Sequence, residues 1–255
     1  MTRRGYAICT EPRSGSSFLG RILESTGALG RPKEYFSRAR VRAEIWRDPR
    51  AGLTKLLERA SSANGIYGLK MFSYHVDVLA GTGWQSRLPG LVYVHLERRD
   101  LLGRAISSVR AAQSGRAQSW QPKQGLERYD PDAIERQIRI GARDQARWRD
   151  YFARTGIEPL YLEYDQVAAD PQAAADAVAT FVGLDPAPSI DPARIDLAIL
   201  RDEISAEWRR RFVAERGDVT KLAVGGLGWA VHGWLRYARA RLDPFTVRRD
   251  NRDWP

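Results

Sequence analysis

The sequence has few of the residues that form disulfides or bind metals. It contains one cysteine and three histidines in 255 residues. A single cysteine excludes a disulfide framework and a metal site built from several cysteines. The histidines, at positions 75, 95 and 232, are scattered, and no cluster of carboxylates accompanies them, so we expect no metal. Cys9 lies in an apolar segment and is predicted to be a small, buried hydrophobic residue.

Long apolar runs are also missing. No segment reaches the roughly 20 apolar residues that a membrane-spanning helix needs. The first residues, Met1-Thr2-Arg3-Arg4, lead directly into a predicted strand, without the apolar region of a signal peptide. We therefore expect a cytoplasmic protein.

The composition is that of a folded, basic protein. Hydrophobic residues make up 43% of the chain, eight residues are Trp, and the formal net charge is +10. A basic surface attracts nucleic acid, anionic membrane or a small polyanion. Much of the excess is Arg interleaved with Asp and Glu in predicted helices, which is typical of a solvated face. No nucleic-acid-binding motif accompanies the charge, so no nucleic-acid partner is expected.

Strand and helix patterns alternate along most of the chain. Short apolar runs predict strands at 6–9, 66–72, 91–96 and 157–164. Helices are predicted at 18–25, 39–60 with a break at Asp48-Pro49, 101–112 after Asp100, 131–155 after Asp130, and after Asp170-Pro171. This alternation predicts an α/β fold with a parallel sheet and right-handed crossovers.

The first strand and helix enclose a loop rich in hydroxyl groups, Thr10 to Ser17. Backbone N–H groups at the start of a helix favour anions, and the Ser14, Ser16 and Ser17 hydroxyls and Arg13 add donors. The loop is not a Walker A motif, because no Lys follows a glycine in it. The alternative interpretation is an ordinary turn with serine caps.

The residues in and after this loop resemble those of a known family. Arg13-Ser14-Gly15-Ser16-Ser17, then Thr26-Gly27, then Arg31-Pro32-Lys33-Glu34-Tyr35-Phe36, is similar to the Stf0 family of bacterial carbohydrate sulfotransferases. The resemblance implies a P-loop-like three-layer sandwich with a central, mainly parallel sheet. It also implies 3′-phosphoadenosine-5′-phosphosulfate (PAPS) as cosubstrate, without a metal, and a carbohydrate or glycolipid acceptor.

The resemblance also assigns roles to residues. Arg13, Ser14, Gly15, Ser16 and Ser17 would bind the 5′-phosphosulfate, with Arg13 on the leaving phosphate oxygen as a catalytic group. Glu34 matches the catalytic carboxylate, the base for the acceptor hydroxyl. Without the motif around it, Glu34 would be taken for a solvated residue at a helix start.

A second phosphate site is implied further along the chain. Arg98 and Ser107 match the residues that bind the 3′-phosphate of PAPS in the family pattern. By itself, Arg98 could be a surface charge. Lys70, within the strand 66–72, is either a surface lysine at a strand end or a group that reaches the crevice at the carboxyl end of the sheet, and the family pattern favours the crevice.

The resemblance covers roughly residues 6–212 and is weakest in the last third. Ser205 and Trp208 match the family, but several polar positions around them do not. We therefore divide the chain into a sulfotransferase domain, 1–217, and an extension of unknown role, 218–255. Peripheral membrane contact through 222–241 and formation of a homodimer are both left open. The polar segment 115–129, with Trp120 and Tyr129, is a candidate lid or acceptor-binding segment.

Three functions compete at this point. Transfer of sulfate from PAPS to a carbohydrate is favoured. A P-loop-like nucleotide kinase is the second, and lacks the loop lysine and a convincing metal-binding carboxylate. A non-enzymatic, basic nucleic-acid-binding protein is the third and rests on charge alone. Trehalose, lipopolysaccharide sugars and other glycans or glycolipids are all left open as acceptors.

Overall fold

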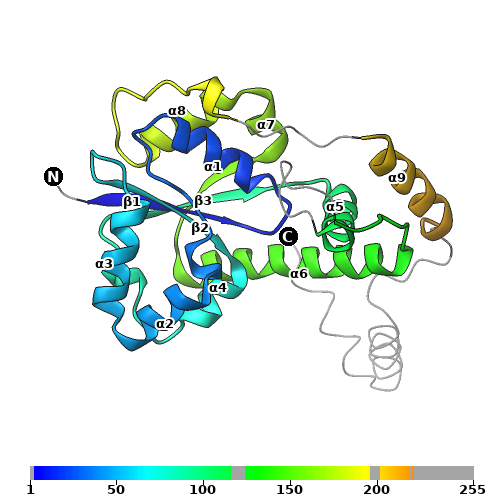
Figure 1. Ribbon diagram of the computed structural model, residues 1–255, viewed down its shortest axis with the longest axis horizontal. Coiled ribbons are helices and arrows are strands. Elements are labelled where there is room, and N and C mark those ends of the chain that lie inside the picture. The colour runs from blue at the N-terminus through cyan, green and yellow to red at the C-terminus, as the bar shows by residue number, and fades with distance from the viewer. Residues whose placement is uncertain (1–2, 116–123, 196–201, 219, 221–255) are drawn as a thin grey trace, which may run out of the picture. The chain divides into compact units, whose positions relative to one another are not determined.

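A computed structural model describes residues 3–115, 124–195, 202–218 and 220 (Figure 1). The contacts divide the chain into two units, residues 1–209 and 210–255. The sheet, the hydrophobic cores and every site described below belong to the first unit. In the second unit, the described residues are the end of a helix, α9 (Glu203–Arg216), and the few positions that follow it.

Four parallel strands form the central sheet. They are β1 (Arg4–Thr10), β2 (Ile66–Phe72), β3 (Leu91–Glu97) and β4 (Leu160–Glu163), in the order β2-β1-β3-β4. β1 pairs in parallel with both β2 and β3, so all carboxyl ends lie on one edge. β2 is buried along its whole length and β1 along nearly all of it, as expected for strands covered on both faces.

Helices cover both faces of the sheet and complete the three layers (Figure 1). On one face, α1 (Ser16–Ser25) and α8 (Pro171–Phe181) pack Leu19, Ile22 and Val178 against the sheet. On the other face lie α2 (Ala39–Arg47), α3 (Pro49–Ala60), α4 (Ser73–Leu79) and α6 (Pro131–Thr155). Cys9 is buried in the core on this second face, as predicted.

Aspartate caps begin several helices where the sequence predicts them. Asp48, Asp130 and Asp170 accept a hydrogen bond from the backbone N–H three residues on, and proline follows each of them in the first turn. Asp100 begins α5 (Leu101–Ser114) in the same way. The predicted break at Asp48-Pro49 therefore separates α2 from α3.

The structure corrects one predicted strand and adds two short helices. The predicted strand at 157–164 is shorter, because Pro159 has no N–H for sheet pairing and Tyr164 already begins α7 (Tyr164–Ala169). The helices α4 and α7 were not predicted, since six or seven residues show too little periodicity. Short 3-10 turns, η1 (Tyr35–Ser37), η2 (Gln85–Arg87) and η3 (Pro192–Arg194), complete the described elements.

Within the described residues, we find no helix with both the length and the apolar character needed to cross a membrane. Trp120 and the segment 222–241 lie outside the described residues.

Candidate active site

The carboxyl edge of the sheet brings the predicted site residues together. The chain leaves β1 through the serine loop, β3 through Arg98, and β4 through Tyr164. β1 lies between β2, which follows it in sequence, and β3, so the chain changes direction across the sheet at β1. Open α/β sheets bind ligands in the crevice at such a switch point. The predicted anion loop therefore occupies the position where this fold binds ligands.

Two residues of the serine loop have left-handed backbone angles. Gly15, the residue before α1, has φ 86°, and a Cβ atom there would lie 2.0 Å from the Tyr164 ring. Arg13 has φ 66°, an unusual angle for a residue with a side chain. For a residue with a side chain, such as Arg13, this angle is costly, and such residues cluster at ligand-binding loops. Gly15 has no side chain to cap α1, which leaves capping of the first turn to other groups.

Arg13 and Arg98 place two positive charges beside each other. Arg13 Nε donates a hydrogen bond to Ser107 Oγ at 3.0 Å, which joins the loop to α5. Arg98 Nη1 donates to the Arg13 carbonyl at 3.4 Å, and its guanidinium lies 5.1 Å from the centre of the Tyr164 ring. Burial lowers the pKa of Arg13, and the neighbouring Arg98 charge lowers it further. A bound anion would relieve this repulsion.

Two buried polar atoms mark where an anion fits. Ser14 Oγ and Arg98 Nε are buried, and neither has a hydrogen-bond partner among the residues that the structure describes. Buried polar groups are nearly always paired, so such atoms indicate a missing ligand or water. Both atoms can donate to phosphate oxygens. The predicted 5′ and 3′ phosphate residues thus converge on a site whose chemistry suits a nucleotide with two phosphate groups.

Lys70 connects the loop to Glu34. Its side chain is only 5% exposed, and Nζ lies 2.8 Å from Glu34 Oε1 and 3.1 Å from Ser17 Oγ. Glu34 reaches this place because Lys33 forms a parallel bridge with Leu69, and the Lys33 carbonyl accepts from Lys70 N–H at 3.1 Å. Of the two interpretations of Lys70, the structure supports the crevice.

A buried ion pair lies behind the loop. Glu11, the residue after β1, pairs with Arg104 of α5 at 3.3 Å, and both are almost fully buried. Burial raises the pKa of Glu11 to about 7, and the Arg104 charge only partly opposes this. The pair ties the loop to the same helix that carries Ser107. Sequence reasoning missed it, although a charged residue directly after an apolar strand is an available signal.

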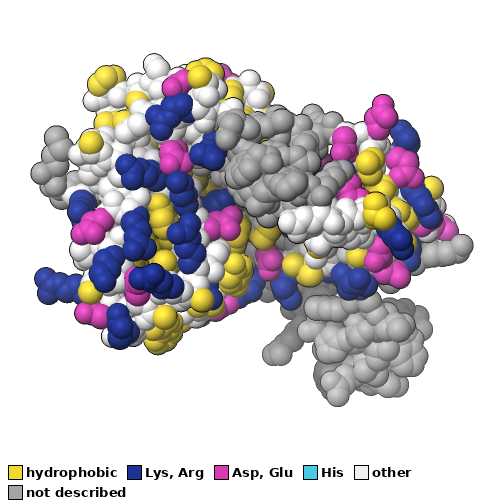
Figure 2. All heavy atoms as spheres, in the orientation of Figure 1, with side chains coloured by type: hydrophobic (Ala, Val, Ile, Leu, Met, Phe, Trp, Pro, Cys, Tyr) yellow, Lys and Arg dark blue, Asp and Glu magenta, His cyan; other side chains and the backbone are white. Residues whose placement is uncertain are grey.

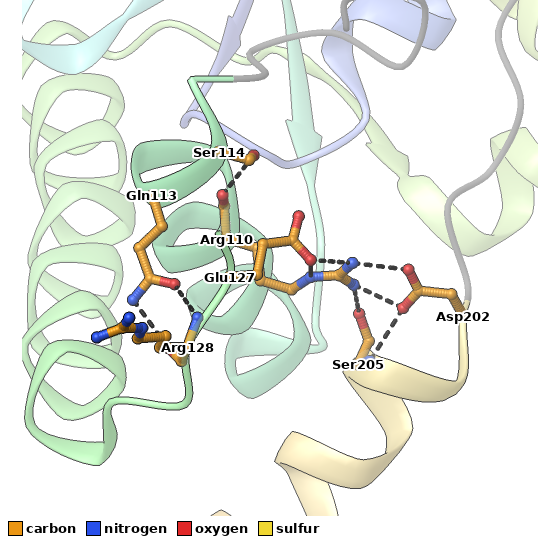
Figure 3. Close-up of polar contacts among 7 residues, drawn as sticks. All are labelled: Arg110, Gln113, Ser114, Glu127, Arg128, Asp202 and Ser205. Atoms are coloured by element: carbon orange, nitrogen blue, oxygen red, sulfur yellow. Dashed lines mark hydrogen bonds and ion pairs between the residues drawn. The ribbon is translucent and has the colours of Figure 1, made fainter. Parts of the chain in front are cut away.

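A second cluster of charges organises the carboxyl end of α5. Arg110 is nearly buried, and its guanidinium binds Glu127 at 2.7 Å, Asp202 at 2.6 Å and the Ser205 hydroxyl (Figure 3). Gln113 exchanges two hydrogen bonds with the backbone of Arg128. These contacts attach the described end of the candidate lid, 124–129, to α5.

Ser205 and Trp208, the two family matches in the last third, meet at this cluster. Trp208 is buried and packs edge-on against Tyr129, with 5.8 Å between ring centroids. Within the first unit, Trp208 therefore joins the first turns of α9 to the end of the candidate lid, and Ser205 joins them to α5.

Figure 2 shows Lys and Arg side chains gathered over the part of the visible face where β1 and α3 lie in Figure 1. Among the described residues, no three His, Cys, Asp or Glu side chains come together to hold a metal. The expectation that no metal is needed stays a prediction.

Comparison with known proteins decides the family. The family model described as Stf0 sulphotransferase matches residues 5–215. The chain belongs to the Stf0 sulphotransferase family. This confirms the predicted family, the sulfotransferase fold and the assignment as an enzyme, a sulfotransferase, in place of the kinase and nucleic-acid-binding alternatives. Use of PAPS is the general property of the family.

Two curated proteins are similar to this chain over most of its length. Trehalose 2-sulfotransferase of Mycobacterium tuberculosis is 28% identical over 261 residues, covering 83% of this chain and 95% of the relative. Trehalose 2-sulfotransferase of Mycolicibacterium smegmatis is 22% identical over 258 residues, covering 81% and 93%.

Solved sulfotransferase structures align more loosely with this family member. One from Alicyclobacillus acidocaldarius has a TM-score of 0.46 at 15% identity, covering 84% of this chain and 93% of its own. The sulfotransferase domain of the curacin biosynthetic pathway has a TM-score of 0.44 at 11% identity, covering 84% and 97%.

Proposed function

We propose that this sulfotransferase moves the sulfuryl group of PAPS to a hydroxyl group of a carbohydrate acceptor. The observation that carries the proposal is the convergence of Arg13, Arg98 and the unpaired Ser14 hydroxyl on one buried, positively charged site. The relatives named for trehalose support a sugar as acceptor, and trehalose is the first acceptor to test.

The loop residues would hold the phosphosulfate end of the cosubstrate. Ser14, Gly15, Ser16 and Ser17 supply hydroxyl and backbone donors at the start of α1, where the helix dipole favours negative charge. Arg13 would stabilise the charge that develops on the leaving phosphate oxygen. Charge stabilisation and positioning supply most of the catalysis in the related phosphoryl transfers.

Arg98 and Ser107 would hold the 3′-phosphate. Arg98 has a buried donor without a partner, and Ser107 already accepts from Arg13, so its hydroxyl proton is available for donation. The Arg13–Ser107 contact would then transmit the position of one phosphate site to the other.

Glu34 would accept the proton of the acceptor hydroxyl. Its carboxylate is partly exposed on one side and contacts Lys70 on the other, so an acceptor can approach it. Through its contact with Ser17, Lys70 would hold the base in a fixed position relative to the sulfuryl group. We add Lys70 to the residues predicted from the sequence, as a positioning residue. A general base of this kind contributes roughly 10²–10⁴ in rate.

The donor assignment is tested by binding of 3′,5′-bisphosphoadenosine and AMP, measured by calorimetry. The wild type should prefer the bisphosphate, and Arg98→Ala should remove about ten- to a hundredfold of that preference, the worth of a charge-assisted hydrogen bond. Arg99→Ala is the matched control, because Arg99 is 80% exposed and pairs with Glu163. Equal binding of both nucleotides by the wild type would refute the 3′-phosphate site.

The base is tested by Glu34→Gln on the same preparation. Sulfate transfer from PAPS to a confirmed acceptor should fall by about 10²–10⁴, while bisphosphate affinity stays within a few-fold. Glu58→Gln, an exposed glutamate of α3, serves as control. Normal turnover would remove Glu34 from the mechanism, and loss of nucleotide binding would make it a structural residue of the loop.

The cytoplasmic location, the division at residue 217, membrane contact through 222–241, a homodimer and the absence of a nucleic-acid partner stay predictions.

A further inference from the structure

An exposed apolar strip begins at the start of α4, the helix that directly follows β2 and its Lys70. It consists of Tyr74 and Val78 of α4 and Trp46 of α2, whose side chains are 42%, 37% and 54% exposed. Single exposed hydrophobic residues are ordinary, but these three adjoin one another. Tyr74 and Val78 are four residues apart on one helix face, and Trp46 Nε1 donates to the Val78 carbonyl at 3.0 Å.

The strip is connected to Glu34 by a short series of contacts. The Glu34 carbonyl accepts from Ser37 N–H at 3.2 Å, and the Ser37 hydroxyl lies 3.2 Å from His75 Nε2. The His75 ring lies 4.3 Å from the Tyr74 ring. His75 Nδ1 accepts from Phe72 N–H, so the proton is on Nε2 and is directed at Ser37. Contacts through Ser37 and His75 thus link the Tyr74 ring to the backbone of Glu34.

The direction of the strip gives it a polar end and an apolar end. At the Tyr74 end, the ring contacts His75, and the Ser37 hydroxyl beside His75 leads to Glu34, so polar groups that suit a sugar lie at this end. Val78 lies about 6 Å further along the helix axis, and Trp46 adjoins it. A tyrosine ring offers an apolar face together with a polar hydroxyl. Beyond Tyr74 the exposed large side chains of the strip are apolar.

We propose that the acceptor is a glycoside with an apolar aglycone, whose sugar ring packs on Tyr74 beside Glu34 and whose aglycone lies along Val78 and Trp46. The inference rests on the proposed function and makes the acceptor class narrower. The continuity of the strip with the base favours an acceptor over a protein partner, because a hydroxyl presented to Glu34 places the remainder of the same molecule on these side chains.

The test compares methyl glucoside and octyl glucoside as acceptors, both below the micelle concentration, with labelled PAPS. Burial of two or three methylene groups should lower KM for the octyl compound about fifteen- to sixtyfold. Val78→Ser and Trp46→Gln should remove this advantage and leave KM for the methyl compound unchanged. Tyr74→Ala should raise KM for both. Ile140→Ser, on α6, is the control for loss of an exposed apolar side chain.

The outcomes separate this inference from the proposed function. Sulfate transfer to both glucosides with the same KM would overturn the inference and leave the proposed function intact. No transfer to any sugar, with normal bisphosphate binding, would refute the carbohydrate acceptor and the inference with it. A wild-type dimer that Trp46→Gln and Val78→Ser convert to a monomer, with unchanged KM values, would assign the strip to a second copy of the chain and overturn the inference.

Discussion

Two buried titratable groups beside the active site should change the stability of the fold in opposite directions with pH. Burial raises the pKa of Glu11 from 4.5 to about 7. Burial lowers the pKa of His75 from 6.5 to about 4, although the Glu34 carboxylate opposes this. The contribution of Glu11 to the free energy of unfolding is fully present below pH 4.5 and is lost as pH rises through 7. The His75 contribution is present above pH 6.5 and is lost as pH falls through 4.

The magnitudes follow from these displacements. A difference of one in pKa between the folded and unfolded states is worth about 1.4 kcal/mol. Folding raises the pKa of Glu11 from 4.5 to about 7 and lowers that of His75 from 6.5 to about 4. Each displacement changes the free energy of unfolding by about 3 kcal/mol across its pH range, and the two changes have opposite signs. Burial lowers the pKa of His95 as well, which adds to the His75 side. In the wild type these effects largely offset one another between pH 4.5 and 6.5.

Glu11→Gln separates the two effects. The variant lacks the Glu11 contribution, which decreases as pH rises. We therefore subtract the free energy of unfolding of the variant from that of the wild type, and this difference should decrease by about 3 kcal/mol between pH 4.5 and 7. A constant offset is also expected, because Arg104 loses its buried partner. His75→Gln should change the difference in the opposite direction.

The assay is urea unfolding at constant ionic strength, followed by tryptophan fluorescence from the buried Trp84 and Trp148. Urea is preferred to guanidinium, which would screen the charges. Parallel pH curves for the wild type and Glu11→Gln would refute the reasoning, since Glu11 would then have the same proton affinity in both states.

Two further predictions concern the site and its support. Gly15→Ala should weaken bisphosphate binding at least about tenfold, or about 1.4 kcal/mol, because its Cβ would meet the Tyr164 ring at 2.0 Å. In Gly27→Ala, where φ is also positive but nothing lies within 4 Å, calorimetry should show unchanged affinity; equal losses in both variants would contradict the steric argument. Arg110→Ala should destabilise the fold by about 3–5 kcal/mol, since Glu127 and Asp202 lose a nearly buried partner. Arg149→Ala, which breaks an exposed pair with Glu97, should cost about 0–1 kcal/mol in the same urea experiment. An equally small cost for Arg110→Ala would show that the ion pairs of Arg110 do not stabilise the fold.

Local patterns in the sequence were sufficient for the elements and for the anion loop. Asp48-Pro49, Asp130-Pro131 and Asp170-Pro171 begin helices through contacts within three residues, so their effect can be predicted from the chain alone. The buried strand 66–72 was predicted with its observed ends for a similar reason, since turn residues and an apolar run mark it. The order of strands and helices then predicts the parallel sheet and the edge where the loop lies.

The tertiary structure alone decided which side chains meet at that edge. Lys70 could be a surface charge or a site residue, and only its contacts with Ser17 and Glu34 distinguish the two. Arg110 binds partners 17 and 92 residues away, a pairing that no local spacing encodes. Burial by surrounding elements, rather than neighbouring sequence, likewise sets the pKa of Glu11. Contacts between distant residues depend on how the elements pack, and the composition of each element does not contain that information.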